Sequence, residues 1–191
     1  MNNITSMAAG KTVVVLGDSL SAAYEMAAED GWVDLLQGKI TSKGLAYKVQ
    51  NESISGDTSG NGLYRMREIV RRGKFSHLVL ALGANDGLRG LPFQQMQDNL
   101  GGIIKMAQEQ GAKVFLIGID LPGNYGNFYK NGFDAVYVAL SKEYDVPLLQ
   151  ADLLVAVPKV PEYFNDDGLH PNPKAQPLIM ESVWDKLNKY L

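Results

Sequence analysis

Cysteine is absent from this 191-residue chain, and histidine occurs only twice, as His77 and His170. Without cysteine the protein has no disulfide, no thiolate nucleophile and no cysteine-ligated zinc or iron–sulfur centre. Two histidines are too few for a zinc site built on three, and any histidine-dependent catalysis must use one of them. No stretch of the sequence approaches the ~18 apolar residues of a membrane-spanning helix.

A strong net charge is also missing, since 18 Lys and Arg residues stand against 21 Asp and Glu residues, which gives −3. A nucleic-acid-binding domain would show a basic patch, so we expect neither nucleic acid nor an anionic membrane as a partner. The length fits one domain, assigned to residues 11–191, after an N-terminal tail at residues 1–10. This tail lacks the basic start and apolar core of a secretory signal peptide. The chain is therefore either cytoplasmic, with Met1 as its native start, or a mature form whose signal was removed.

Short apolar runs alternate along the chain with helical patterns. The runs lie at residues 12–16, 47–51, 78–82, 114–118 and 146–149, and helical spacing marks residues 93–110, 131–144 and 172–191. Several runs are apolar on both faces, as in parallel strands covered by helices. The alternation predicts an α/β fold, a three-layer α/β/α sandwich with a five-stranded parallel sheet in the order 2-1-3-4-5.

Polar, glycine-rich segments follow three of these strands, at residues 17–20, 55–58 and 83–87, and a fourth precedes the last helix at residues 166–171. Ligands of open α/β sheets bind outside the carboxyl ends of the strands, where the strand order reverses. With the order 2-1-3-4-5 this crevice lies between the first and third strands. Ser19 and Asn85 are then expected to face each other across it.

Ser19 follows the first strand directly. A serine at a strand-to-helix turn often serves only as a helix cap. The same position directs its Oγ into the crevice and places its backbone N–H where negative charge is stabilised. The G-x-S-x-G turn of the larger α/β-hydrolases is absent from the chain.

His170 and Asp167 are spaced so that the carboxylate can bind Nδ1–H and leave Nε2 free to act as a base. The alternative is a capped loop in which Asp167 only starts a turn. His77 begins an apolar run and is expected at the opposite, amino end of the sheet, in a structural role.

Gly56 and Asn85 are candidate hydrogen-bond donors to an oxyanion. The Asn85 side chain carries an N–H, and a glycine lets its backbone N–H approach a ligand closely. Together with the Ser19 amide they form a possible oxyanion hole. The alternatives are a simple turn glycine and a turn-capping asparagine.

Two other functions compete with this interpretation. Asp18, Asn85, Asp167 and His170 could ligate a divalent metal in a phosphoesterase, although a chain with one free histidine is poor in the imidazole such sites use. Asp18 and Asp86 raise this possibility, but Asp18 is better explained as holding its own loop through backbone hydrogen bonds. A flavodoxin-like nucleotide-binding module would need a phosphate loop, and no such motif occurs.

Taken together, the segments GDSLSAAY (17–24), SISGDTSGNG (53–62), LGANDGLRG (82–90), LPGNYG (121–126), DVPLL (145–149) and DDGLHPNPKAQP (166–177) resemble the GDSL, or SGNH, hydrolase family. The likeness is to its bacterial thioesterase I-like group of esterases, arylesterases, thioesterases and lysophospholipases. It implies Ser19 as nucleophile, His170 as general base and acid and Asp167 as orienter. It also implies Ser19, Gly56 and Asn85 as oxyanion donors, without metal or other cofactor.

The resemblance further favours a monomeric, periplasmic or secreted enzyme that acts on small acyl esters or thioesters. A carbohydrate acetyl esterase on the same fold is the alternative. Two departures stand out: Ala84, where relatives often have a second glycine, and Asp120, where some carry a basic residue that would hold an anionic head group.

Two loops, at residues 87–92 and 120–127, are expected to form the walls of an acyl-binding groove. Both mix glycine with leucine, proline or tyrosine, which combines mobility with apolar contact. The residues expected to contact the substrate are Leu88, Leu91, Leu121, Pro122 and Tyr125. Arg65 and Arg89 are expected either to be solvated or to contact an anionic substrate.

Overall fold

Five parallel strands form a single sheet at the centre of the molecule. The computed structural model describes residues 11–121, 123–149 and 153–191. Its strands are β1 (Lys11–Gly17), β2 (Tyr47–Asn51), β3 (His77–Ala81), β4 (Lys113–Ile117) and β5 (Leu148–Leu149). Their order is β2-β1-β3-β4-β5. The predicted strand order and parallel pairing are confirmed, whereas the predicted tail at residues 1–10 lies outside the described residues.

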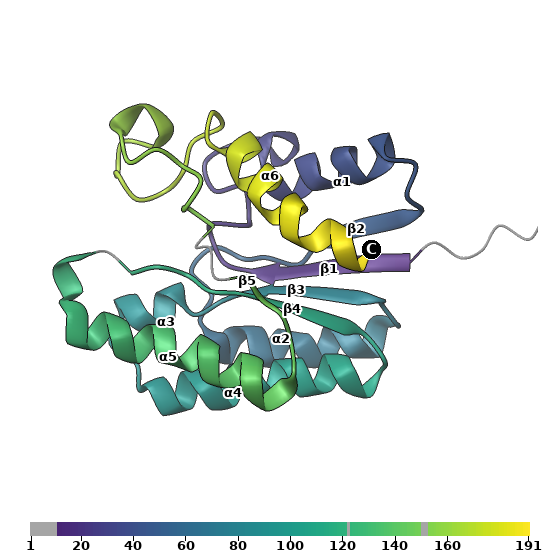
Figure 1. Cartoon of the computed structure of the whole chain (residues 1–191), viewed down its shortest axis with the longest axis horizontal. Helices are drawn as coiled ribbons and strands as arrows, with labels where there is room; N and C mark the ends of the chain where they lie inside the picture. Colours follow the sequence, from purple (N-terminus) through teal and green to yellow (C-terminus); the bar gives the residue numbers. More distant parts are fainter. Residues whose placement is uncertain (1–10, 122, 150–152) are drawn as a thin grey trace, which may run out of the picture.

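Helices cover both faces of the sheet (Figure 1). On one face lie α1 (Trp32–Ser42) and α6 (Gln176–Leu187). On the other lie α2 (Ser59–Arg72), α3 (Ala84–Leu88), α4 (Phe93–Glu109) and α5 (Asn127–Tyr144). Short 3-10 helices occur at Ala28–Asp30, Gly123–Tyr125, Pro161–Tyr163 and Asn188–Tyr190. The three-layer α/β/α sandwich is therefore confirmed.

The central strands are apolar on both faces because each face is covered. In β1, Val13 and Val15 pack with α1 and α6, whereas Val14 and Leu16 pack with α2 and α4. Alternate side chains of a strand point to opposite faces, so a strand buried on both sides shows no polar alternation. This is why residues 13–16 of β1 are a continuous run of valine and leucine.

Three elements differ from their predicted bounds by more than one residue. The α5 helix begins at Asn127 rather than 131, and α6 begins at Gln176 rather than 172. Pro173 lies in the turn before α6, where the Ala175 N–H donates to the Asn172 carbonyl oxygen at 3.0 Å. The strand predicted at 146–149 is shorter because the Val146 N–H bonds back to α5, and Pro147 has no N–H to donate.

The carboxyl ends of all five strands lie at one edge of the sheet, because the strands are parallel. In Figure 1 this is the side toward which the arrow of β1 points, and the segment before α6 arches over it. Within the described residues, no helix combines the length and the apolar character needed to cross a membrane.

Candidate active site

Ser19, His170 and Asp167 form one chain of hydrogen bonds at this edge of the sheet. Ser19 Oγ lies 2.9 Å from His170 Nε2. On the other side of the ring, His170 Nδ1 lies 2.6 Å from Asp167 Oδ2. Ser19 follows β1, and the other two residues come from the segment before α6, so the fold joins groups 151 residues apart in the sequence. The arrangement is that of a nucleophile, a base and an orienting carboxylate.

Asp167 is held by its own turn as well as by the imidazole. Its Oδ1 accepts hydrogen bonds from the backbone N–H groups of Leu169 at 2.8 Å and His170 at 2.9 Å. Desolvation raises the pKa of Asp167, but these bonds and the one from the His170 ring outweigh it and lower the pKa to about 2. The carboxylate therefore stays ionised at neutral pH, as an orienter of imidazolium requires.

The His170 loop is a closed turn. The Asn165 N–H donates to the His170 carbonyl oxygen at 2.8 Å, and the Gly168 N–H donates to the Asn165 carbonyl oxygen at 2.9 Å. Gly168 adopts a positive φ of 67°, which a residue with a Cβ adopts only at a cost. Phe164 and Pro171 form an antiparallel bridge at the base of the turn. These bonds fix the backbone on both sides of the histidine.

Tyr24 contacts the His170 imidazole, a contact that the sequence does not reveal. Its ring centroid lies 4.3 Å from that of His170, with the two planes tilted by 37°. Tyr24 belongs to the irregular segment after Ser19, in which Ala23 and Glu25 have positive φ. Only the five-residue spacing from Ser19 marks it in the sequence, and this spacing alone says nothing about a partner so distant in the chain.

The turn that carries Ser19 is organised by Asp18, as the sequence suggested. Asp18 is buried, its Oδ1 accepts from the Leu20 N–H at 3.1 Å, and its carbonyl oxygen accepts from the Ser21 and Ala22 N–H groups. Burial raises the pKa of the Asp18 carboxyl to about 6, against the opposing effects of the Leu20 amide and of nearby His170. Its Oδ2 accepts no hydrogen bond within the described part of the chain.

A chain of buried hydrogen bonds connects the loop that carries Ser19 to the loop that carries His170. The indole Nε1 of Trp32 donates to the Leu20 carbonyl oxygen at 3.0 Å, and the Trp32 backbone N–H donates to Gln176 Oε1 at 3.0 Å. Gln176 in turn donates from Nε2 to the Pro171 carbonyl oxygen at 3.0 Å. Leu20 follows Ser19 and Pro171 follows His170 in the sequence. The loops of Ser19 and His170 are therefore held by the same hydrogen-bonded pair, Trp32 and Gln176.

Gly56 lies in a tight turn after β2. The Asp57 N–H donates to the Ile54 carbonyl oxygen at 3.2 Å, and Gly56, the third residue of this turn, has a φ of +83°. This φ at the third position is the mark of a type II turn, which favours glycine. Neither the Gly56 nor the Ser19 backbone N–H donates to a protein acceptor in the part of the chain that the structure describes. Both amides are therefore available to a ligand.

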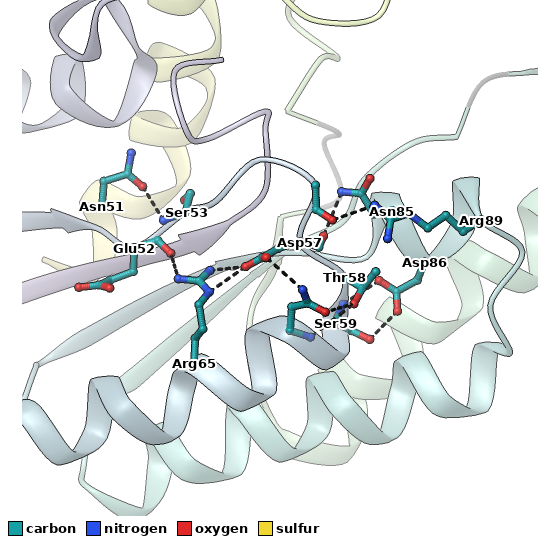
Figure 2. Close-up of polar contacts among 12 residues, drawn as sticks. Asn51, Glu52, Ser53, Asp57, Thr58, Ser59, Arg65, Asn85, Asp86 and Arg89 are labelled. Carbon is teal, nitrogen blue, oxygen red and sulfur yellow. Dashed lines mark hydrogen bonds and ion pairs between the residues drawn. The ribbon is translucent and has the colours of Figure 1, made fainter. Parts of the chain in front are cut away.

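Asn85, in the first turn of α3, is oriented by the Gly56 turn. Its Nδ2 donates to the Asp57 backbone carbonyl oxygen at 2.9 Å (Figure 2). An amide nitrogen has two hydrogens, so this bond leaves one for a ligand. Ala84, which precedes it, has no positive φ, and its methyl group causes no backbone strain at this position.

Acidic residues next to the donors hold the surrounding backbone. Asp86 is buried, and its two oxygens accept from the backbone N–H of Ser59 at 2.7 Å and from the Ser59 hydroxyl at 2.5 Å. The Asp57 carboxylate binds Arg65 instead (Figure 2). Asp86, one of the residues that suggested a metal site, thus joins α3 to the start of α2. No group of three or more His, Asp or Glu side chains suited to a metal ion occurs among the described residues.

The two arginines are bound to the protein rather than merely solvated. Arg65 bonds to Asp57 and to the Glu52 carbonyl oxygen, and Arg89 donates to the Gly56 carbonyl oxygen at 3.0 Å. Both expectations for these arginines, solvation or contact with an anionic substrate, overlooked these internal bonds. Sequence alone could not show them, because their acceptors are mostly backbone atoms of another element.

The two loops expected to form the groove do meet. Tyr125 donates from its hydroxyl to the Leu88 carbonyl oxygen at 3.1 Å, and Leu88 is 40% exposed. Leu91 is half-buried. Leu121 is buried against Gly87 of α3 and belongs to the core. It therefore packs against α3 and does not offer a surface to the substrate, contrary to the prediction. Pro122 lies outside the described residues.

His77 and Asp120 lie apart from the catalytic chain. His77, at the amino end of β3, is buried between Ser76 Oγ and the Tyr190 carbonyl oxygen, and its burial lowers the pKa of the ring. Asp120 forms an ion pair with Lys130. That pair borders a cavity of about 380 Å³ at the ends of β4 and β5, which none of the catalytic or oxyanion residues lines.

Comparison with known proteins gives close relatives over nearly the whole chain. The chain is 42% identical to Esterase TesA of Pseudomonas aeruginosa, covering 98% of this chain and 93% of that protein. It is 42% identical to an arylesterase of Vibrio mimicus, covering 96% and 91%. Identity to the Thioesterase 1/protease 1/lysophospholipase L1 of Escherichia coli K12 is 43%, covering 91% and 82%.

A solved structure of a psychrotrophic esterase, EstA from Pseudoalteromonas, superimposes with a TM-score of 0.89 at 38% identity, covering 94% of this chain and 98% of that one. That esterase was solved inhibited by monoethylphosphonate. The sequence profile of the GDSL-like lipase/acylhydrolase family matches residues 15–177. Relatives and structure thus confirm the resemblance seen in the sequence and the expected carboxylic ester hydrolase class. The chain belongs to the GDSL-like lipase/acylhydrolase family.

Proposed function

We propose that this ester hydrolase cleaves acyl esters and thioesters through a covalent acyl-enzyme on Ser19. The observation that carries the proposal is the hydrogen-bond chain from Ser19 Oγ through His170 to Asp167, at 2.9 and 2.6 Å. Distances of this kind allow the imidazole to take the hydroxyl proton as the oxygen attacks.

In the first half-reaction, Ser19 Oγ forms a bond to the acyl carbon while His170 Nε2 takes the proton. The carbonyl double bond becomes an oxyanion, and Asp167 stabilises the imidazolium that results. Collapse of this tetrahedral species breaks the bond to the alcohol or thiol, and His170 returns the proton to that leaving group. The ester of Ser19 remains.

In the second half-reaction, water takes the place of the leaving group. His170 Nε2 accepts a proton from the water as the water oxygen bonds to the acyl carbon. Collapse of this second tetrahedral species breaks the bond between the acyl carbon and Ser19 Oγ, and His170 returns the proton to Oγ. The carboxylic acid is released and the serine hydroxyl is restored. The same three side chains serve both halves because the base alternates between proton acceptor and donor.

Three donors support the oxyanion in both steps. The backbone amides of Ser19 and Gly56 have no protein acceptor within the described residues, and one hydrogen of the Asn85 amide remains free. Donors fixed before the reaction stabilise charge that develops in the transition state without a cost of reorganisation. Each of these donors is typically worth ~10²–10³ in rate.

The proposed substrate class rests on the apolar loops next to Asn85 and on the names of the relatives. Leu88, Leu91 and Tyr125 offer apolar contact on two joined loops, which suits an acyl chain. The relatives are named as esterase, arylesterase, thioesterase and lysophospholipase. We therefore propose small acyl esters and thioesters with varied leaving groups as substrates.

The test is covalent labelling with a p-nitrophenyl alkylphosphonate, followed by mass spectrometry of the peptides. We expect one phosphonyl group on the peptide that contains Ser19 and loss of ester hydrolysis in proportion to the labelling. The Ser19→Ala variant should remain unlabelled and inactive, whereas Ser55→Ala, which removes an exposed serine near the same crevice, should be labelled normally. Labelling of Ser19→Ala at the wild-type rate would overturn the assignment.

A further inference from the structure

Arg65 of α2 binds both ends of the segment that carries Gly56. Before the turn, one terminal nitrogen of its guanidinium donates to the Glu52 carbonyl oxygen at 2.5 Å. After the turn, its Nε donates to Asp57 Oδ2 at 2.8 Å, and the other terminal nitrogen, Nη2, lies 2.6 Å from the same oxygen (Figure 2). A single rigid group thus spans the turn, and its several donors in one plane make that possible.

The ion pair is shielded from solvent. The Arg65 side chain is 20% exposed and the Asp57 side chain is 7% exposed. By contrast, the Arg71–Glu68 pair on the same helix is 76% and 56% exposed. A shielded pair is screened less by salt and water, so it holds its partners in one geometry more firmly than a surface pair does.

Asp57 links the ion pair to two of the three proposed oxyanion donors, Gly56 and Asn85. Its backbone N–H closes the turn on the Ile54 carbonyl oxygen, so a shift of Asp57 also displaces the Ser55–Gly56 peptide, which carries the Gly56 N–H. Its carbonyl oxygen also accepts the hydrogen bond from Asn85 Nδ2 at 2.9 Å, so the same shift turns the Asn85 amide. Among the described residues, Arg65 makes no hydrogen bond to Ser19, Asp167 or His170.

We propose that Arg65 is a positioning residue for the oxyanion hole, which sets the spacing of the Gly56 and Asn85 donors through Glu52 and Asp57. The inference rests on the proposed function, because it assumes that these donors bind the oxyanion. Small displacements of catalytic groups cost much of their effect in the transition state. A positioning role therefore appears in kcat and leaves KM nearly unchanged.

The first measurement compares Arg65→Met with Arg71→Met in the hydrolysis of p-nitrophenyl butyrate. We expect Arg65→Met to lower kcat about ten- to a hundredfold with little change in KM. Arg71→Met removes an exposed arginine from the same helix and should retain wild-type kcat. Arg65→Lys keeps the charge but has one nitrogen for two acceptors, so it should restore part of the lost activity.

Stability must be separated from positioning, since Arg65→Met leaves a buried, unpaired carboxylate at Asp57. The double variant Arg65→Met/Asp57→Asn removes both charges and should recover most of the loss in Tm. If the pair positions the donors, kcat of the double variant stays low. Recovery of kcat together with Tm would show a purely structural role and overturn the proposal.

A double-mutant cycle with Asn85→Ala provides the second criterion. If Arg65 acts partly through the Asn85 amide, Arg65→Met should cost a smaller factor in kcat in the Asn85→Ala background than in the wild type. Equal factors in both backgrounds would contradict the proposal. If Asn85→Ala is slow but Arg65→Met is fully active, the positioning role of Arg65 is overturned and the oxyanion hole stands. A fully active Asn85→Ala would overturn the oxyanion hole itself, and with it the basis of the inference.

Discussion

The Tyr24 ring packs against the His170 imidazole, with 4.3 Å between the ring centroids. Hydrogen bonds to Ser19 and Asp167 hold the two ring nitrogens of the imidazole, but neither bond supports its face. Tyr24 supplies a contact to the ring itself. It therefore limits the tilt of the base toward Ser19.

Replacement of Tyr24 by alanine should lower kcat about three- to tenfold, because the imidazole loses its lateral support and spends less time aligned with Ser19 Oγ. Tyr24→Phe keeps the ring and should retain nearly full activity. Steady-state hydrolysis of a p-nitrophenyl ester measures both. Tyr64→Ala, which removes an exposed tyrosine of α2, is the control, and equal losses in Tyr24→Ala and Tyr64→Ala would refute a specific role.

Asp167→Ala should reduce kcat about 10²–10⁴-fold, since the imidazole loses the group that orients it and stabilises its charge. The neighbouring Asp166 is also exposed but makes no hydrogen bond to the ring, so Asp166→Ala is a matched control. Circular dichroism should show both variants folded. If Asp166→Ala were the slower of the two, the orienting carboxylate would have to be reassigned.

Asp18→Asn should stabilise the protein at neutral pH. The folded pKa of Asp18 is about 6, against 3.8 for a free aspartate, so the folded state binds the proton more tightly than the unfolded state does. Ionisation of Asp18 therefore lowers the free energy of unfolding as pH rises from about 4 to about 6, and the loss is complete above that range. At 1.36 kcal/mol for each pKa unit, the full penalty is about 3 kcal/mol.

Urea unfolding of wild type and Asp18→Asn at several pH values measures this effect. The two curves should converge near about pH 4 and separate by up to about 3 kcal/mol above about pH 7. The Asn side chain retains an oxygen for the Leu20 N–H, so that bond is conserved. A difference in unfolding free energy that does not vary with pH would contradict the assignment.

Leu88→Ala should weaken the use of long acyl chains. Leu88 is 40% exposed on the loop joined to Tyr125, and loss of its side chain should reduce kcat/KM for octanoyl esters by about tenfold or less while acetyl esters are little affected. A panel of p-nitrophenyl esters, acyl-coenzyme A, a lysophospholipid and acetylated xylan measures chain length and leaving group together. Phe128→Ala, at a side chain 96% exposed on α5, is the control. An equal loss for acetyl and octanoyl esters would place Leu88 outside the acyl-binding surface.

The sequence predicted the sheet and its order because buried parallel strands are short, continuous and apolar. It placed the candidate residues Ser19 and Asn85 because each follows a strand, and parallel strands bring their carboxyl ends together. Ser19 and Asn85 could be placed in this way without any contact being known. The structure brings Ser19 and His170 within hydrogen-bond distance at this edge.

The supporting contacts were not predictable in the same way. The bond from Arg65 to Glu52 and the bond from Asn85 to Asp57 both use backbone carbonyl oxygens, which every residue has. A sequence pattern therefore cannot identify these acceptors. The boundaries of α6 and β5 also depended on local backbone bonding rather than on hydrophobic spacing.

The hydrogen bonds through Trp32 and Gln176 make the pairing of Ser19 with His170 depend on the packing of α1 against α6. Gln176 of α6 binds both the Trp32 amide of α1 and the Pro171 carbonyl oxygen, so this contact ties the His170 loop to α1 in addition to the bonds within its own turn. Ester hydrolysis is therefore expected to depend on the packing of α1 against α6, although neither helix carries Ser19, Asp167 or His170.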